Sequence, residues 1–192
     1  DLPIWFDKII VKTWPCGTDK LFAMRNYGIV FPDGRNIAAG SSSWLIVDQT
    51  TRKIQRPDFS LYRFKDDYSS FNSPVRSAEK LAGASGEGVT SPAFKVKTSD
   101  LDVNLHTNNA NYIKWVIDSY DLDFILTHSP HSAEINYLAE SKHDEEIIIK
   151  TSAETDKNLI FNHSVFRISE NRELCRIKLE WHDQSNIKQE LR

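Results

Sequence analysis

Apolar residues are concentrated in three short segments of the first third of the chain, a pattern typical of consecutive β-strands. Proline and glycine interrupt this pattern at residues 15–17 and 32–34, and both residue types favour turns. The intervening segments 8–14, 21–31 and 37–47 are the predicted strands. The pattern predicts an antiparallel meander at the start of the chain.

The hydrophobic pattern weakens after residue 48. Residues 49–92 contain charged positions, Pro57, Pro74 and the glycine-rich run 83–88, a composition that favours a connector. We therefore expect an N-terminal unit over residues 1–70, a connector over 71–92 and a C-terminal unit over 93–192.

The last hundred residues combine one apolar helix with a series of strands. Residues 109–120 carry apolar side chains around most of a helical circumference, and Lys114 and Asp118 form an i,i+4 pair on the remaining face. A helix this apolar should be buried. Strands are predicted over 93–98, 133–140, 146–153, 159–168 and 173–182. This order favours an α+β fold in which a curved antiparallel sheet covers a helix.

Strand 173–182 has a clear two-faced pattern. Cys175 shares one face with apolar positions, so we expect it to pack in the core and take no part in chemistry. The members of that predicted face are Glu173, Cys175, Ile177, Leu179 and Trp181.

Composition narrows the class of protein. The 192 residues include 24 basic and 27 acidic side chains, and this net charge of -3 argues against nucleic acid as a partner. No apolar run is long enough to span a bilayer, so no membrane insertion is expected. The two cysteines lie far apart, and neither they nor His128, His131, His143, His163 and His182 show metal-ligand spacing. We expect no metal and no cofactor.

The densest polar cluster lies at residues 99–109, just before the predicted helix. If this segment is extended, Asp102, Asn104 and His106 lie on one side of it and could share a site. Asn108 or Asn109 is placed to cap the helix, whose first N–H groups favour negative charge. An alternative is that these residues only form a turn and a cap.

The run Asp-Leu-Asp-Val-Asn-Leu-His-Thr-Asn-Asn-Ala-Asn-Tyr-Ile-Lys-Trp over residues 100–115 resembles the acyl-acyl carrier protein thioesterase family. Weaker similarity appears at residues 13–15, 20–25, 43–57 and 127–128. The resemblance implies two tandem hot dog units, each a curved antiparallel sheet around a central helix. The N-terminal unit would then lack its opening strand and helix in this sequence.

The resemblance also implies a catalytic set, which is Asp102, Asn104, His106 and Glu140. Many family members have a cysteine directly after that glutamate, whereas this chain has Ser141, so a thiolate mechanism is excluded there. We expect Glu140 to accept a proton from water, and His106, oriented by Asp102, to position the substrate or to protonate the leaving thiolate. The roles of His106 and Asp102 could be exchanged. Ser141 as an activated serine is a less favoured alternative, because the sequence shows no distinct base for it. Asn104 and helix N-terminal amides would stabilise the oxyanion. The expected substrate-binding residues are Asn108, Asn109, Tyr112, Trp115, Ser141 and Trp44.

The expected partner is acyl carrier protein with a fatty acyl chain, and a homodimer is possible. Carrier protein is acidic, so a basic rim is expected, and the candidates are Arg52, Lys53, Arg56, Lys95 and Lys97. We expect a cytoplasmic protein, or a plastid stromal one if a transit peptide was removed.

Three other functions compete with the expected one. An acyl-CoA thioesterase of the same fold and a non-catalytic acyl-binding module stay open. A hydratase is disfavoured, because hot dog hydratases carry proline where this chain has Leu105.

Overall fold

The computed structural model describes residues 2–57, 79–86, 88–154 and 159–184. The chain divides into two compact units, Asp1–Glu79 and Lys80–Arg192.

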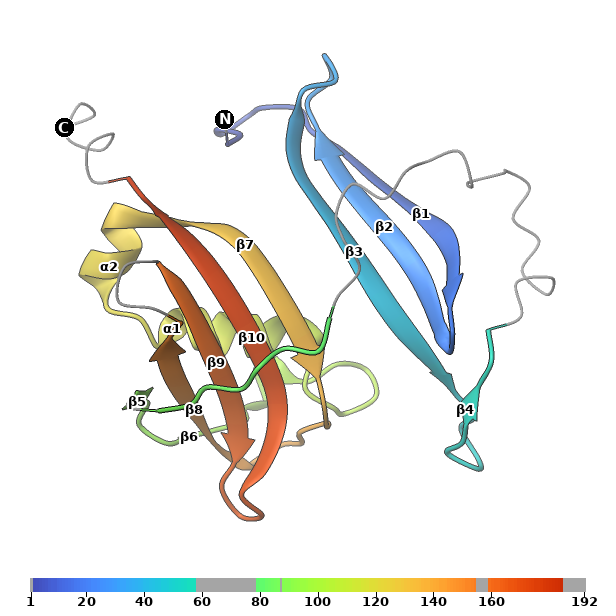
Figure 1. Cartoon of the computed structure of the whole chain (residues 1–192), viewed down its shortest axis with the longest axis vertical. Helices are drawn as coiled ribbons and strands as arrows, with labels where there is room; N and C mark the ends of the chain where they lie inside the picture. The colour runs from blue at the N-terminus through green and yellow to red at the C-terminus, as the bar shows by residue number, and fades with distance from the viewer. Residues whose placement is uncertain (1, 58–78, 87, 155–158, 185–192) are drawn as a thin grey trace. The chain divides into compact units, whose positions relative to one another are not determined.

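The N-terminal unit is a four-stranded antiparallel sheet in the order β1-β2-β3-β4 (Figure 1). The strands are β1 (Ile10–Asp19), β2 (Phe22–Val30), β3 (Asn36–Val47) and β4 (Ile54–Gln55). The predicted meander is therefore confirmed. The predicted turn at residues 32–34 is also present, because the Gly34 amide donates to the Phe31 carbonyl at 2.9 Å and Gly34 has a φ of 91°. Residues 2–57 contain no helix.

The predicted turn at residues 15–17 is wrong. β1 continues through this segment, and the pairing with β2 shifts register between Pro15 and Gly17. A bulge in an edge strand accommodates a proline, whose missing N–H costs no ladder hydrogen bond there, and Gly17 takes a φ of 101°.

The C-terminal unit contains a six-stranded antiparallel sheet in the order β5-β8-β9-β10-β7, with β6 also paired to β8. Its long strands are β7 (His128–Tyr137), β8 (Glu146–Ala153), β9 (Ile160–Arg167) and β10 (Arg172–Asp183), and its short ones are β5 (Val89–Thr90) and β6 (Phe94–Lys95). β8 has the predicted bounds. The predicted strand 93–98 is reduced to β6, followed by the 3-10 turn η3 (Thr98–Asp100).

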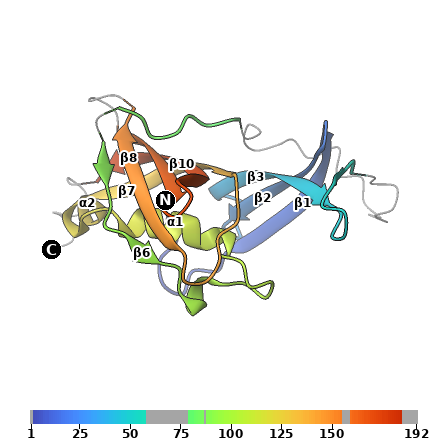
Figure 2. The same ribbon diagram turned by 90° about the horizontal axis from the view of Figure 1, so that it is seen from below.

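Helix α1 (Asn109–Asp118) lies against one face of this sheet (Figures 1 and 2). Its Tyr112, Trp115 and Val116 are buried against a core that the strands supply. Lys114 and Asp118 form the expected ion pair on the exposed side. The helix is therefore buried as predicted, by its apolar face. No helix among the described residues is long and apolar enough to cross a membrane.

A second helix, α2 (Leu122–Thr127), was not predicted. Its six residues lie directly between α1 and β7, too short a stretch for helical periodicity to show.

The predicted core face of β10 is correct except at Glu173. The strand carries a bulge between Glu173 and Cys175, which adds Leu174 to the core. Glu173 turns to the other face, where its carboxylate accepts hydrogen bonds from Arg176 and Ser164. Cys175 is fully buried as expected, and burial raises the pKa of its thiol to about 12.

The end of the predicted connector is bound to the C-terminal sheet. The Ala84 amide donates to the Ser164 hydroxyl at 2.9 Å, the Ser85 amide donates to the Ser152 hydroxyl at 3.2 Å, and Leu81 is buried. In Figure 1 this green segment crosses the strands on its way to β5. Residues 81–86 therefore belong structurally to the C-terminal unit.

Candidate active site

The polar cluster before α1 forms a closed loop. A β-bridge joins Leu101 to Thr107, and the Asp102 amide donates to the His106 carbonyl at 2.8 Å. Leu105 adopts a φ of 62°, a left-handed conformation that costs free energy for leucine. The expectation of an extended segment with Asp102, Asn104 and His106 in one row is therefore wrong.

Asp102 holds this loop together. Its Oδ1 accepts hydrogen bonds from the backbone amides of Asn104 at 2.8 Å and of His106 at 3.3 Å. This is the local side-chain to backbone bonding that aspartate favours in turns. The contacts of Asp102 therefore position the His106 backbone, whereas the expected contact with the imidazole ring is not present among the described residues.

The His106 ring contacts Glu140. The distance between Nε2 and the Glu140 Oε2 is 3.4 Å, and the side chains are 28% and 63% exposed. Glu140 follows β7, and the amides of Leu138 and Ala139 anchor this segment by donating to the Leu174 carbonyl. The structure thus brings together an imidazole and a carboxylate that are both accessible to water and to a substrate.

Three buried hydroxyls lie beside this pair. The Ser141 hydroxyl donates to the Thr107 hydroxyl at 2.7 Å, and the Thr107 amide donates to the Ser141 carbonyl at 2.9 Å. Because Ser141 has only one hydroxyl hydrogen, the Tyr112 hydroxyl, 2.9 Å away, donates to it. Ser141 and Thr107 directly follow Glu140 and His106. The cluster therefore joins the two segments that carry the candidate catalytic pair.

This surrounding argues against Ser141 as a nucleophile. Its side chain is fully buried, and its hydroxyl contacts only Thr107 and Tyr112 among the described residues. Burial raises the pKa of the Tyr112 hydroxyl above its ordinary value, so neither neighbour is a base near neutral pH.

Sequence analysis missed Thr107, although its place between His106 and the helix cap is a signal that could have identified it.

The start of α1 offers one candidate oxyanion donor in the backbone. The Asn108 side chain caps the helix by accepting from the Ala110 amide at 3.0 Å, as expected. The Asn111 amide donates to the Asn108 carbonyl at 2.9 Å. Within residues 88–154, the backbone N–H of Asn109 donates no hydrogen bond. It therefore remains for a ligand at the positive end of the helix dipole.

The three aromatic residues expected to bind substrate lie in different parts of the structure. Tyr112 and Trp115 lie in the core, where their rings pack edge to face at 5.2 Å. They support the loop and do not form an open surface. Trp44 lies on β3 of the N-terminal unit, is 51% exposed, and its indole N–H donates to Ser42 at 2.6 Å.

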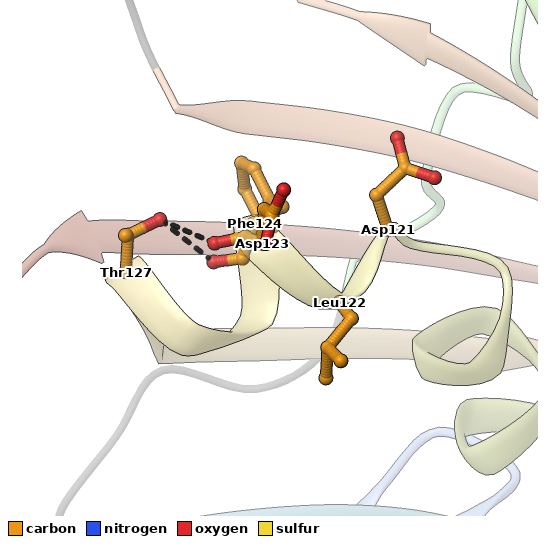
Figure 3. A pocket seen from close by; sticks show the side chains of 5 residues that line it. All are labelled: Asp121, Leu122, Asp123, Phe124 and Thr127. Carbon is orange, nitrogen blue, oxygen red and sulfur yellow. Dashed lines mark hydrogen bonds between the residues drawn. The ribbon is translucent and has the colours of Figure 1, made fainter.

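A hollow in the surface lies over α2 and is separate from the expected site residues (Figure 3). It is lined by Asp121, Leu122, Asp123, Phe124 and Thr127. The Thr127 hydroxyl within it donates to the carbonyls of Asp123 and Phe124, so its polar group is already used.

The candidates for a basic rim are exposed. Lys95 forms an ion pair with Asp144 at 2.9 Å, and this carboxylate raises the pKa of the lysine. An exposed ion pair of this kind contributes little stability, and Lys95 therefore remains a candidate for the basic rim. Arg52, Lys53 and Arg56 lie in the N-terminal unit.

Comparison with known families gives a decisive result. Residues 84–183 match the model of the acyl-ACP (acyl carrier protein) thioesterase C-terminal domain, and residues 1–59 match the N-terminal domain of the same family. The chain belongs to the acyl-ACP thioesterase family. The site loop, Glu140 and the hydroxyl cluster all lie in the C-terminal match.

Curated relatives are similar over most of this chain. The oleoyl-acyl carrier protein thioesterase of Coriandrum sativum is 27% identical in an alignment of 168 positions that covers 81% of this chain and 45% of the relative. Oleoyl-acyl carrier protein thioesterase 2 of Arabidopsis thaliana is 26% identical over 82% of this chain and 46% of the relative. The chain spans about half the length of these relatives.

Solved structures support the fold. An acyl-ACP thioesterase from Bacteroides thetaiotaomicron is 24% identical with a TM-score of 0.78, covering 92% of this chain and 69% of that one. A 12:0-ACP thioesterase from Umbellularia californica is 20% identical with a TM-score of 0.74, over 94% and 68% of the two chains. The tandem hot dog prediction for this acyl-ACP thioesterase family member is therefore confirmed.

Proposed function

We propose that this protein hydrolyses the thioester of acyl-acyl carrier protein, releasing free fatty acid and ending chain elongation. The observation that supports the proposal is the contact between His106 and Glu140 at 3.4 Å, in a chain that belongs to the acyl-ACP thioesterase family. An imidazole beside a carboxylate can move a proton, which thioester hydrolysis requires in both of its steps.

In the first step, Glu140 accepts a proton from water as the water oxygen attacks the thioester carbonyl carbon. Negative charge develops on the carbonyl oxygen, and the Asn109 amide and the Asn104 side chain are its proposed donors. Asn104 is exposed and lies in the loop that Asp102 holds.

In the second step, the tetrahedral intermediate collapses and the carbon–sulfur bond breaks. The leaving thiolate needs a proton, and His106 supplies it. Glu140 passes the proton taken from water to His106, and this is the proton that His106 gives to the thiolate, so both side chains end as they began. The 3.4 Å separation is slightly long for a hydrogen bond, and catalytic contacts of this kind commonly tighten when substrate binds.

The family and the named relatives favour carrier protein over coenzyme A as the donor. We propose acyl carrier protein as the partner, recognised by a basic rim, with a homodimer as one possible assembly. The plant relatives are named as chloroplastic proteins, which supports the plastid alternative over the cytoplasmic expectation.

The test is release of free fatty acid from a panel of acyl-carrier-protein thioesters, with the matching acyl-CoA thioesters beside them. Glu140→Gln and His106→Ala should each lower kcat by about 10²- to 10⁴-fold, because each removes a proton-transfer group. Glu146→Gln, which alters an exposed glutamate on β8, is the matched control and should keep wild-type turnover.

Wild-type turnover by Glu140→Gln would show that the base is wrongly assigned. If the folded wild type binds acyl chains but releases no acid, the chain is an acyl-binding module. Faster hydrolysis of the coenzyme A esters would make that thioester the donor.

A further inference from the structure

The pairing of β7 with β10 contains one extra residue. Ser132 pairs with Glu180, and Pro130 pairs with Trp181, so His131 is inserted between two consecutive pairs. In a regular strand His131 would lie on the face opposite to Ser132. The bulge instead turns its side chain toward the face of Glu180 and His182, an effect for which bulges are known at functional positions.

Three metal-ligating side chains meet at this bulge. The rings of His131 and His182 stack with their centroids 3.9 Å apart and their planes at 18°. The donor atoms of His131, His182 and Glu180 all lie within 4.8 Å of one another. Sequence spacing gave no sign of this set, because His131 and His182 come from strands 51 positions apart that only the sheet brings together.

The carboxylate of this set is oriented by a neighbour. Ser132 donates a hydrogen bond to Glu180 Oε2 at 3.1 Å, as outer-sphere groups do for metal-binding carboxylates. Among residues 2–57, 79–86, 88–154 and 159–184, no cationic side chain forms an ion pair with Glu180. Its negative charge is therefore open to a cation. Lys178, two residues earlier on the strand, pairs with Glu154 at 3.0 Å.

The chemistry of two imidazoles and one carboxylate suits zinc. Zn²⁺ binds histidine nitrogen and glutamate oxygen at about 2.0 to 2.2 Å in a tetrahedron, which places two ligand atoms about 3.3 Å apart. The observed spacing is at most 4.8 Å, and His131 and His182 are exposed. Zinc binding would therefore require one ring to rotate out of the stack so that the three donor atoms approach to that distance.

We propose that His131, Glu180 and His182 form a zinc site at the edge of the C-terminal sheet, with water in the fourth position. The site lies on the face of β10 opposite to the buried Leu179 and Trp181, and none of its ligands belongs to the His106–Glu140 pair. Bound zinc would join the edge strand β7 to β10 through side chains, in addition to the backbone ladder.

Calorimetric titration of the chelator-treated full chain with Zn²⁺ tests this site, with Co²⁺ absorption as a second probe of coordination. One zinc ion should bind per chain and raise the melting temperature. His131→Ala, His182→Gln and Glu180→Gln should each weaken binding by at least about tenfold, and Ser132→Ala by about 10- to 100-fold. His143→Ala, at an exposed histidine outside the cluster, should bind zinc as the wild type does.

Circular dichroism without metal establishes that each variant is folded, which is expected because the changed side chains lie at the surface. Absence of zinc binding by the wild type would overturn the proposal. Equal binding by the wild type and the His131→Ala and His182→Gln variants would overturn it too, since zinc would then bind elsewhere.

Discussion

The Ser141 hydroxyl donates to the Thr107 hydroxyl at 2.7 Å, and this bond joins the residue after Glu140 to the residue after His106. The two backbones are also joined, because the Thr107 amide donates to the Ser141 carbonyl. The distance between His106 and Glu140 thus depends on the buried contact between the next residue of each segment, Thr107 and Ser141.

Ser141→Ala should lower both activity and stability. The substitution leaves the Thr107 and Tyr112 hydroxyls with one fewer partner in a buried place, which costs about 1 to 3 kcal/mol of unfolding free energy. Small displacement of catalytic groups reduces rate, and we expect kcat to fall by about 10- to 100-fold. Denaturant unfolding and fatty acid release measure the two effects.

Ser152→Ala is the control for this prediction. It removes a buried hydroxyl that accepts from the Ser85 amide, away from the site, and should lower stability without lowering kcat. Complete loss of turnover in a folded Ser141→Ala protein would instead indicate that the serine attacks the substrate.

Two substitutions of Asp102 distinguish a structural role of its side chain from a role of its negative charge in the reaction. Both amides that it accepts from contact Oδ1, which asparagine also has, so Asp102→Asn should keep the loop and most of the activity. Asp102→Ala removes the acceptor and should lower kcat by about 10²-fold, because the His106 backbone is no longer held. Steady-state kinetics of the two variants measures this difference. Equal loss in both would mean that the negative charge takes part in the reaction.

The strands show how much of the fold was predictable. The predicted strand 146–153 matches β8 at its observed bounds, and Ile147 and Ile149 of this strand enter the core. The pattern failed at Gly17 and at Glu173, where a bulge adds a residue and exchanges the two faces. A bulge depends on the pairing partner, which period-two reasoning does not include.

The local geometry predicted for the candidate site was wrong. The Asp102 carboxylate accepts hydrogen bonds from the backbone amides of Asn104 and His106, and this local bonding competed successfully with the extended conformation. The contact between His106 and Glu140 joins residues 34 positions apart, so no local pattern contains it. Resemblance to the family supplied Glu140, whereas the structure was needed to identify Thr107.

His163 makes the stability of the C-terminal unit depend on pH. The ring is fully buried between Tyr120, whose hydroxyl lies 3.0 Å from Nε2, and Thr151, whose hydroxyl lies 2.9 Å from Nδ1. Burial disfavours the charged ring and lowers its pKa from 6.5 to about 4. Between these values the unfolded chain binds more protons than the folded one, so stability falls as pH falls.

Unfolding free energy should therefore decrease by about 2 kcal/mol between about pH 7 and about pH 5, from this histidine alone. Carboxylates with lowered pKa values, such as Glu173, lose their contribution only at lower pH and do not enter this window. Urea unfolding at the two pH values measures the change. His163→Gln should be less stable at neutral pH, since it disturbs the buried contacts, but its stability should vary much less across the window. His143→Gln, at an exposed histidine, should keep the wild-type slope, and an unchanged slope in His163→Gln would assign the pH dependence to another group.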